Sequence, residues 1–352
     1  MSGTATFGKH DLIFKQPSGT SRGVLKTKTT YFIKLISGAS VGYGECGLLK
    51  GLSHDDVPDY EEKLQWACTH IHLGLETLWQ ALIAYPSIQF GLEQAFMSVK
   101  ASNPFELFPS AFTRQEQPID INGLIWMGDE AFMSDQIQAV IEKGFSCVKM
   151  KIGAIDVDQE LALLKAIRAR FSKDLITLRV DANGAFSKRE ALTIMNRLAA
   201  LEVHSIEQPL AVSKVSDLAA LCKETPIPVA LDESLIGCLT MEEKERLLDT
   251  VKPQYIILKP SFIGGFKGSE AWITLAEERG IGWWATSALE SNVGLNAISQ
   301  WVYLKNTTLP QGLGTGSLYT NNIPSPLRVQ EGRIIYKGDT PWETNAIDTI
   351  CI

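Results

Sequence analysis

Short strand-like runs and helical runs alternate along the chain from about Pro118, and this alternation constrains the fold more than any other feature. The run IDINGLIWMG (119–128) precedes the helical run DEAFMSDQIQAVIEKG (129–144), and the same pairing recurs six more times up to residue 305. A last short run, QGLGTGSLY (311–319), is a candidate eighth strand. Strands that alternate with helices are usually parallel, so the pattern predicts a parallel sheet with helical crossovers.

Two folds fit this alternation, a doubly wound open sheet and a closed barrel. A strand count near eight over roughly 200 residues matches the size of the closed (β/α) barrel. The first strand is not followed by a G-x-G-x-x-G turn, which removes the main signal for a dinucleotide-binding sheet. We therefore predict an α/β fold with a modified TIM barrel of the (β/α)7β type as the catalytic domain, over residues 116–324.

The N-terminal part of the chain has a different order, with strands first and helices after them. Strand-like runs cover residues 5–15, 25–37 and 40–49, and runs with a helical spacing of apolar residues cover 53–72, 74–85 and 87–101. This order is typical of a small α+β unit. We predict an α+β capping domain over residues 1–115, completed by the C-terminal segment 325–352.

Charge and cysteine usage narrow the class of protein. The net charge of −7 argues against a nucleic-acid-binding surface, which would need a basic patch. No apolar run approaches the ~20 residues of a membrane span, and the first residues lack the apolar core of a signal peptide. The six cysteines are scattered without a C-x-x-C pair, which is typical of a reduced chain. We expect a cytoplasmic protein with a small-molecule partner and no nucleic-acid or membrane partner.

Three acidic residues, Asp181, Glu207 and Asp232, follow three consecutive strands of the predicted barrel. Barrel active sites lie at the carboxyl ends of the strands, so these side chains should converge. Three adjacent carboxylates need a cation to stay ionised, and their hard oxygen atoms favour Mg²⁺, whereas zinc would favour histidine or cysteine. The alternative is structural: each acid caps the following helix or pairs with a barrel lysine.

Lysines accompany the acids on the second and sixth strands. The second strand contains Lys149 and Lys151 in the run CVKMKIG, and the sixth ends at Lys259. Second and sixth strands lie on opposite sides of an eight-stranded barrel, so a bound ligand meets a lysine on each face. We interpret Lys151 as a base and Lys149 as a residue that helps to place the substrate, although both could simply form ion pairs with the acids. Other polar residues at strand ends are Asn183, Glu233, Ser287 and Glu290.

These motifs together resemble the enolase superfamily, in its muconate-lactonizing-enzyme subgroup. The subgroup's pattern appears here as KMK, VDANG, IEQP, LDES and LKPS, and the resemblance covers nearly the whole chain. It implies that Asp181, Glu207 and Asp232 bind Mg²⁺ and that Lys151 and Lys259 form the acid/base pair. Asn183 and Glu233 would then lie behind the metal ligands and orient them.

Within the subgroup the chain is most similar to the o-succinylbenzoate synthases, through KPSFIGG and SALESNVGLNAISQW with QGLGTGSLYTNN. The resemblance implies a dehydration of 2-succinyl-6-hydroxy-2,4-cyclohexadiene-1-carboxylate (SHCHC) to o-succinylbenzoate in menaquinone synthesis, with Lys151 abstracting the α-proton. Ser287, with Glu290 nearby, would contact the substrate's succinyl carboxylate. The segments PSGTSRGVL (17–25) and LLKGLSH (48–54) would close over the barrel mouth.

Other functions stay open at this point. Opposed lysines also suit an N-acylamino acid racemase or a dipeptide epimerase, although dipeptide epimerases carry an Asp-x-Asp motif where this chain has GLGTGSLY. Cycloisomerisation of muconate is a further alternative. A non-catalytic ligand-binding barrel would be expected to have lost metal or lysine positions, and here all are present. The sequence leaves the oligomeric state open, a homo-oligomer included.

Overall fold

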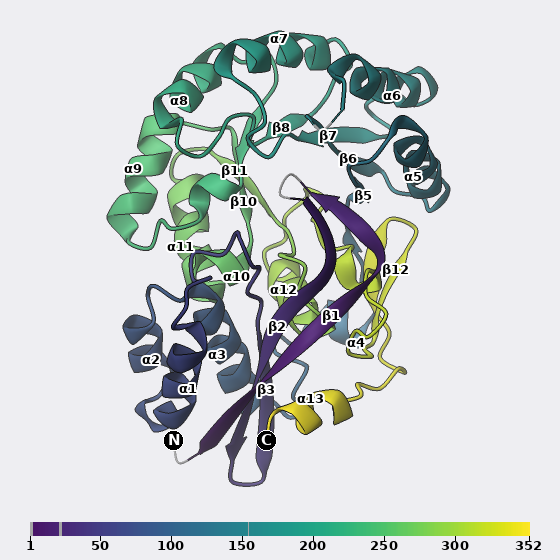
Figure 1. Cartoon of the computed structure of the whole chain (residues 1–352). Coiled ribbons are helices and arrows are strands. Elements are labelled where there is room, and N and C mark those ends of the chain that lie inside the picture. Colours follow the sequence, from purple (N-terminus) through teal and green to yellow (C-terminus); the bar gives the residue numbers. More distant parts are fainter. Residues whose placement is uncertain (1–2, 21–22, 154) are drawn as a thin grey trace.

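The computed structural model describes residues 3–20, 23–153 and 155–352. It has two parts, a barrel with an outer arc of helices and an N-terminal cap beside the barrel mouth (Figure 1). Ser21 and Arg22, which belong to the expected cap segment 17–25, lie outside the described residues. None of the described helices is long and apolar enough to cross a membrane.

Seven parallel strands follow one another around the barrel in sequence order, which confirms the predicted alternation. Their middle residues are almost all buried, as expected for strands covered on both faces. The strands are β5 (Gly123–Ile125), β6 (Cys147–Lys151), β7 (Thr177–Asp181), β8 (Ser205–Glu207), β9 (Val229–Leu231), β10 (Tyr255–Leu258) and β11 (Gly282–Ala285).

The eighth strand is much shorter than the run 311–319 predicted for it. Gln311 forms a parallel bridge to Ile121, and Gly312 forms one to Thr286, so two residues close the barrel between its first and seventh strands. A Cβ atom at Gly312 would lie 1.9 Å from the Thr286 hydroxyl, so glycine is required at this crossing. The rest of the run turns through the 3-10 helix η3 (Thr315–Ser317) at the barrel mouth.

Helices follow the strands and cover the barrel. In Figure 1, α5 to α9 form the outer arc, and α10 to α12 lie between barrel and cap. Several helices begin with a capping box, such as Ser187 with Glu190 and Thr240 with Glu243. The helices are α5 (Glu130–Glu142), α6 (Val157–Arg170), α7 (Lys188–Ala199), α8 (Val215–Glu224), η2 (Glu233–Leu235), α9 (Met241–Val251), α10 (Pro260–Ile263), α11 (Gly265–Glu277) and α12 (Asn292–Tyr303).

The cap is an antiparallel three-stranded sheet packed against helices. Apolar residues of both layers form a core of their own, separate from that of the barrel. Its elements are β1 (Thr4–Thr20), β2 (Gly23–Ser37), β3 (Ser40–Cys46), α1 (Tyr60–Thr69), η1 (Ile71–Leu73), α2 (Leu75–Ala81) and α3 (Pro86–Ser98), and α4 (Ala111–Arg114) leads to the barrel.

The C-terminal segment divides between the two parts. The hairpin of β12 (Leu327–Gln330) and β13 (Arg333–Tyr336) pairs with β4 (Ile119–Asp120), which precedes the first barrel strand. The last helix, α13 (Asn345–Ile350), instead lies against the cap sheet, where Asp348 pairs with Lys34 at 2.8 Å. Both chain termini therefore lie at the cap (Figure 1). The domain boundaries at residues 115 and 324 stay a prediction.

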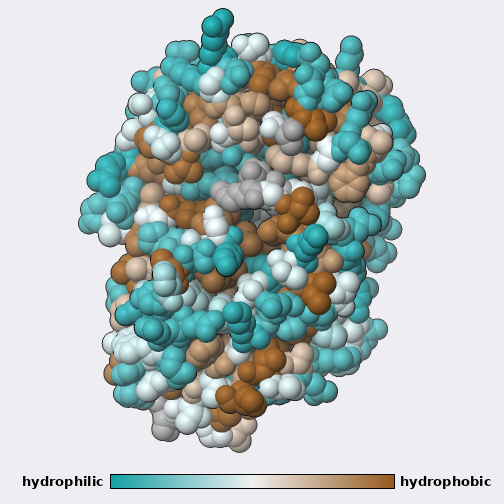
Figure 2. Space-filling model, in the orientation of Figure 1, coloured by the Kyte–Doolittle hydropathy of each residue, from teal (hydrophilic) through white to brown (hydrophobic). Residues whose placement is uncertain are grey.

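The β1–β2 hairpin extends from the cap to the barrel mouth. Phe14 forms a bridge to Tyr319, and the Lys15 N–H donates to the Leu318 carbonyl at 2.8 Å. The hairpin is thus hydrogen-bonded to the segment that follows η3, which places it beside the strand ends. In the view of Figure 2, apolar side chains gather in the band where cap and barrel meet.

Candidate active site

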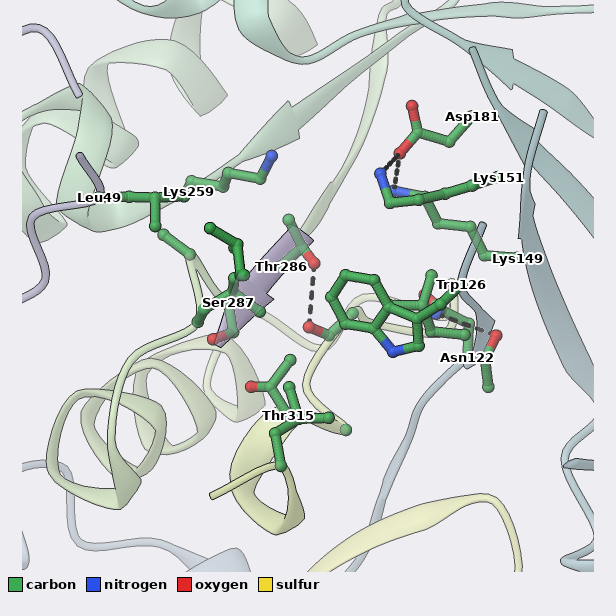
Figure 3. Close-up of a pocket in the computed structure, with 18 of the residues that line it drawn as sticks. Leu49, Asn122, Trp126, Lys149, Lys151, Asp181, Lys259, Thr286, Ser287 and Thr315 are labelled. Carbon is green, nitrogen blue, oxygen red and sulfur yellow. Dashed lines mark hydrogen bonds and ion pairs between the residues drawn. The ribbon is translucent and has the colours of Figure 1, made fainter. Parts of the chain in front are cut away.

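A cavity of about 360 Å³ lies at the carboxyl ends of the barrel strands. The barrel contributes polar residues to its wall, and the cap contributes Leu25, Leu49, Lys50 and Leu52. Three of these four belong to the segment 48–54, and Leu25 ends the segment 17–25, so both expected cap segments border the cavity. Figure 3 shows the wall, with Lys259 on one side and Lys151, Lys149 and Asp181 on the other.

The three predicted metal ligands lie side by side and are buried. Asp181 and Glu207 end β7 and β8 and face each other in register, and Asp232 directly follows β9. Their exposed fractions are 1%, 3% and 2%. Among the described residues, no three His, Cys, Asp or Glu side chains are already close enough together to enclose an ion. Lysine amines lie between the carboxylates instead.

Lys149 is the lysine that lies between two of these acids. Its amine is 3.0 Å from Asp181 Oδ2 and 2.6 Å from Glu207 Oε2. Burial alone would lower the pKa of this amine, but the carboxylates of Asp181, Glu207 and Asp232 outweigh burial and raise it above its usual value. A raised pKa keeps the Lys149 amine protonated, which agrees with the predicted positioning role.

Lys151 has a different set of partners, although it is only two residues away on β6. Its amine donates to Asn183 Oδ1 at 2.7 Å and lies 3.0 Å from Asp181 Oδ2. Asn183 in turn donates from Nδ2 to Glu233 Oε1 at 2.9 Å. Asn183 has a left-handed backbone (φ 43°), a conformation that asparagine tolerates better than most residues. This turn brings its amide to Lys151.

Lys259 approaches the cavity from the opposite side. It is the first residue after β10 and forms an ion pair with Asp232. Burial lowers the pKa of its amine, but Asp232, Glu233 and Glu207 outweigh this effect and raise it. Lys259 and Lys151 face each other across the cavity in Figure 3. The arrangement can therefore take a proton from one face of a ligand and stabilise charge from the other.

The acids outnumber the lysines in this cluster. Four buried carboxylates face the three lysines, because Glu233 joins the three strand-end acids. Burial raises the pKa of Glu207 well above its usual value, and the neighbouring carboxylates of Asp181 and Asp232 raise it further. At Asp181, Lys149 and Lys151 outweigh burial and lower the pKa. A bound divalent cation would neutralise the remaining negative charge.

Ser287 and Glu290 are close together, but only one borders the cavity. Ser287 lines it, and its hydroxyl donates to Glu290 Oε2 at 2.6 Å. Glu290 is fully buried behind the wall, where it also accepts from the Ala288 N–H at 2.7 Å and from the Ser261 hydroxyl. Glu290 is thus placed to support the wall, and its position does not agree with direct substrate contact.

Sequence analysis missed several residues of the wall. Asn122 and Trp126 come from the first strand and the loop after it, Thr315 comes from η3, and Lys50 comes from the cap. For the other strands we considered the polar residues near the strand end. The same step applied to the first strand would have identified Asn122. Lys50 and Thr315 lie in loops whose path over the mouth has no periodic signal in the sequence.

Comparisons with known proteins agree with this geometry. Residues 133–339 match the family model described as enolase C-terminal domain-like. The chain is 45% identical to the o-succinylbenzoate synthase of Desulfotalea psychrophila, over 93% of this chain and 97% of that protein. The crystal structure of MenC from the same organism aligns with a TM-score of 0.84 at 40% identity, covering 95% of this chain and all of that one. The N-succinylamino acid racemase of Thermus thermophilus is 28% identical, over 85% of this chain and 82% of that protein.

Proposed function

The chain belongs to the family of enolase C-terminal domain-like proteins, and on that premise we propose that it is an o-succinylbenzoate synthase. The observation that carries the proposal is the 45% identity to the Desulfotalea psychrophila enzyme over 93% of the chain. The proposed reaction is the syn-dehydration of SHCHC to o-succinylbenzoate, a step of menaquinone synthesis. Each residue that this chemistry requires borders the cavity or lies directly behind its wall.

The residues present fit a magnesium ion by their chemistry. Asp181, Glu207 and Asp232 offer only hard oxygen donors, and the cluster has more negative than positive side chains. We infer that these three hold the ion, with the Lys149 amine moving aside from between two of them. When bound, Mg²⁺ supplies Lewis-acid stabilisation of the negative charge on the substrate carboxylate.

Lys151 is the proposed base. Its amine takes the proton from ring carbon C1, which bears the carboxylate, and the electron pair of the broken C–H bond remains on the substrate. Asn183 holds the Lys151 amine by the 2.7 Å hydrogen bond, so the amine has a defined position from which to reach C1. Lys259, on the opposite face, stabilises the negative charge that develops.

Water then leaves from the face on which Lys151 lies. The electron pair forms a C1–C6 double bond as the C6–O bond breaks, and the protonated Lys151 gives its proton to the departing hydroxide. The products are o-succinylbenzoate and water, and Lys151 returns to its starting state. Lys149 remains protonated and helps to place the carboxylate. Formation of the aromatic ring drives the elimination.

A second candidate activity, racemisation of N-acylamino acids, has a specific basis. Lys151 and Lys259 face each other across the cavity, which is the arrangement that removal and return of a proton on opposite faces requires. The relative that supports it, at 28% identity, is much more distant than the synthase. We therefore place dehydration first and racemisation second. Muconate cycloisomerisation and a non-catalytic role come after these two.

A comparison of two substrates tests the proposal. Purified protein with Mg²⁺ is given SHCHC in one assay and an N-succinylamino acid in the other, and kcat/KM is measured for each. We expect dehydration of SHCHC to be the more efficient reaction and chelation of the metal to stop it. Racemisation without dehydration would contradict the proposal.

A further inference from the structure

A short turn of the cavity wall, which we call the wall turn, consists of Ser287, Ala288 and Leu289 and has a strained backbone. All three residues line the cavity shortly after β11. Leu289 has a left-handed backbone with φ 64°, a conformation that is uncommon for a bulky side chain. Backbone strain of this kind persists only where the surrounding structure holds it. The groups that hold the wall turn therefore determine the shape of this part of the cavity.

Glu290 holds the wall turn from behind. Its Oε2 accepts one hydrogen bond from the Ser287 hydroxyl at 2.6 Å and one from the Ala288 N–H at 2.7 Å. Its Oε1 accepts from the Ser261 hydroxyl. The Glu290 side chain is the acceptor in each of these contacts, which is the role of an ionised carboxylate. Because this side chain is fully buried, its negative charge needs a cation near it.

A second buried carboxylate lies next to Glu290, and it comes from the cap. A Cβ atom added at Gly294 would lie 2.8 Å from Glu290 Cγ and 3.0 Å from Glu45 Oε2, so both side chains contact the same glycine. Glu45 is also fully buried, and it accepts hydrogen bonds from the Thr30 hydroxyl and the Ser291 N–H, both at 2.8 Å. Two neighbouring buried carboxylates repel each other, so one cation near them would stabilise both.

Lys28 is the cation that lies near these two carboxylates. It belongs to β2 and is 3% exposed, and its amine has no hydrogen-bond partner within the described residues. Burial lowers the pKa of the Lys28 amine, and the charges of Glu290 and Glu45 act against burial. A buried amine without a direct partner is costly to a fold, so its presence between cap and barrel indicates that its charge has a function.

The hairpin that carries Lys28 is the part of the cap that extends to the barrel mouth (Figure 1). Leu12 is opposite Lys28 on the neighbouring strand of the hairpin, and it packs with Phe14 and Tyr319. The Tyr319 hydroxyl in turn donates to the Leu289 carbonyl of the wall turn at 2.7 Å. The hairpin and the wall turn therefore meet at one buried place, and Lys28 contributes the positive charge there.

We propose that Lys28 is a positioning residue for the active site: its buried charge stabilises the Glu290 carboxylate, and Glu290 in turn fixes the Ser287 hydroxyl in the cavity wall. The inference rests on the proposed function, in which Ser287 contacts the succinyl carboxylate of SHCHC. Lys28 does not line the cavity and acts through Glu290, across the boundary between cap and barrel. Without Lys28, one of the two buried carboxylates takes up a proton, and the wall turn loses part of its support.

Three single variants test whether the charge of Lys28 matters. K28M removes the charge and keeps the length of the side chain, and we expect kcat/KM for SHCHC to fall by ~10–100-fold, mainly through KM, because the wall binds the substrate less well. K28R keeps the charge and should recover most of this efficiency, whereas a role in packing alone would favour methionine over arginine. K26M is the matched control, since Lys26 is an exposed lysine on the same strand, and it should match wild type.

A double variant tests whether Lys28 acts through Glu290. E290Q removes the negative charge that Lys28 stabilises, so K28M should cost little more in the E290Q background than E290Q alone. If K28M by itself does not fold, E290Q and the double variant perform the test. An active wild type with K28M equal to K26M, K28R no better than K28M, or an equal loss from K28M in both backgrounds would overturn the inference alone. A wild type that does not dehydrate SHCHC would contradict the proposed function and the inference with it.

Discussion

At the scale of the residue, the two lysines of β6 show what sequence could and could not predict. The two lysines are two residues apart, so both point to the same face of a strand. The sequence therefore predicted that Lys149 and Lys151 would share one site. It could not say which lysine has which partner, because the partners come from neighbouring strands. In the structure, Lys149 contacts two strand-end acids and Lys151 contacts Asn183. This difference supports the proposal that Lys149 places the substrate and Lys151 is the base.

Asn183 provides a prediction at this scale. N183G keeps the left-handed backbone but removes the amide that holds the Lys151 amine. We expect kcat for SHCHC to fall by ~10–100-fold with a much smaller change in KM, because the base loses its position and the binding groups remain. N306G is the matched control, since Asn306 has the same backbone conformation (φ 52°) at an exposed turn. Equal kcat values for N183G and wild type would show that Asn183 does not position Lys151.

At the scale of the element, alternation of strands and helices was predictable because each element carries its own local pattern. The eighth strand was not, because only Gln311 and Gly312 pair and their partners are distant in sequence. Individual hydrogen bonds between cap and barrel were also beyond prediction, although the two cap segments at the mouth were predicted. Glu45 of β3 accepts from the Ser291 N–H and the Gly294 N–H, both at 2.8 Å, and so caps α12 from the other part of the molecule. Nothing local to either segment indicates this contact.

The capping contact of Glu45 leads to a prediction for stability. E45Q replaces one acceptor oxygen with an NH₂ that faces N–H and O–H donors, in a fully buried position. We expect the free energy of unfolding to fall by about 2 kcal/mol in equilibrium urea denaturation. E190Q changes an exposed capping glutamate at the start of α7 and should lower the free energy of unfolding much less. Equal effects of the two substitutions would mean that the cap does not stabilise α12.

At the scale of the whole molecule, the sequence predicted two parts, and the structure shows how they share one cavity. The cap contributes apolar residues and Lys50 to a wall whose chemical groups come from the ends of six barrel strands and the closing segment. Composition cannot predict how the cap covers the cavity, because this depends on hydrogen bonds between the β1–β2 hairpin and the segment with Leu318 and Tyr319. The barrel floor is a second feature of the whole fold, formed by His204, Tyr255 and Trp284 around Arg179.

His204 makes global stability dependent on pH. Burial, aided by Arg179, lowers the pKa of His204 to about 4, whereas the unfolded chain titrates near ~6.5. Between these values the unfolded state binds the proton first, so the contribution of His204 to stability is complete above pH 6.5 and is lost as the pH falls towards 4. Urea denaturation of wild type and H204N over this pH range measures the free energy of unfolding of each. We expect the difference between the two free energies to shrink as the pH falls. A difference independent of pH would contradict this account of His204.

The most direct test of the central claim is the turnover of SHCHC by wild type and by K151A, with Mg²⁺ present and the loss of diene absorbance followed. The account predicts that wild type forms o-succinylbenzoate and that K151A is slower by ~10²–10⁴-fold while it unfolds like wild type, because the base is missing. K165A, a change of an exposed lysine on α6, should match wild type. A wild-type protein that leaves the diene intact, or a K151A variant that keeps the wild-type rate, would contradict it.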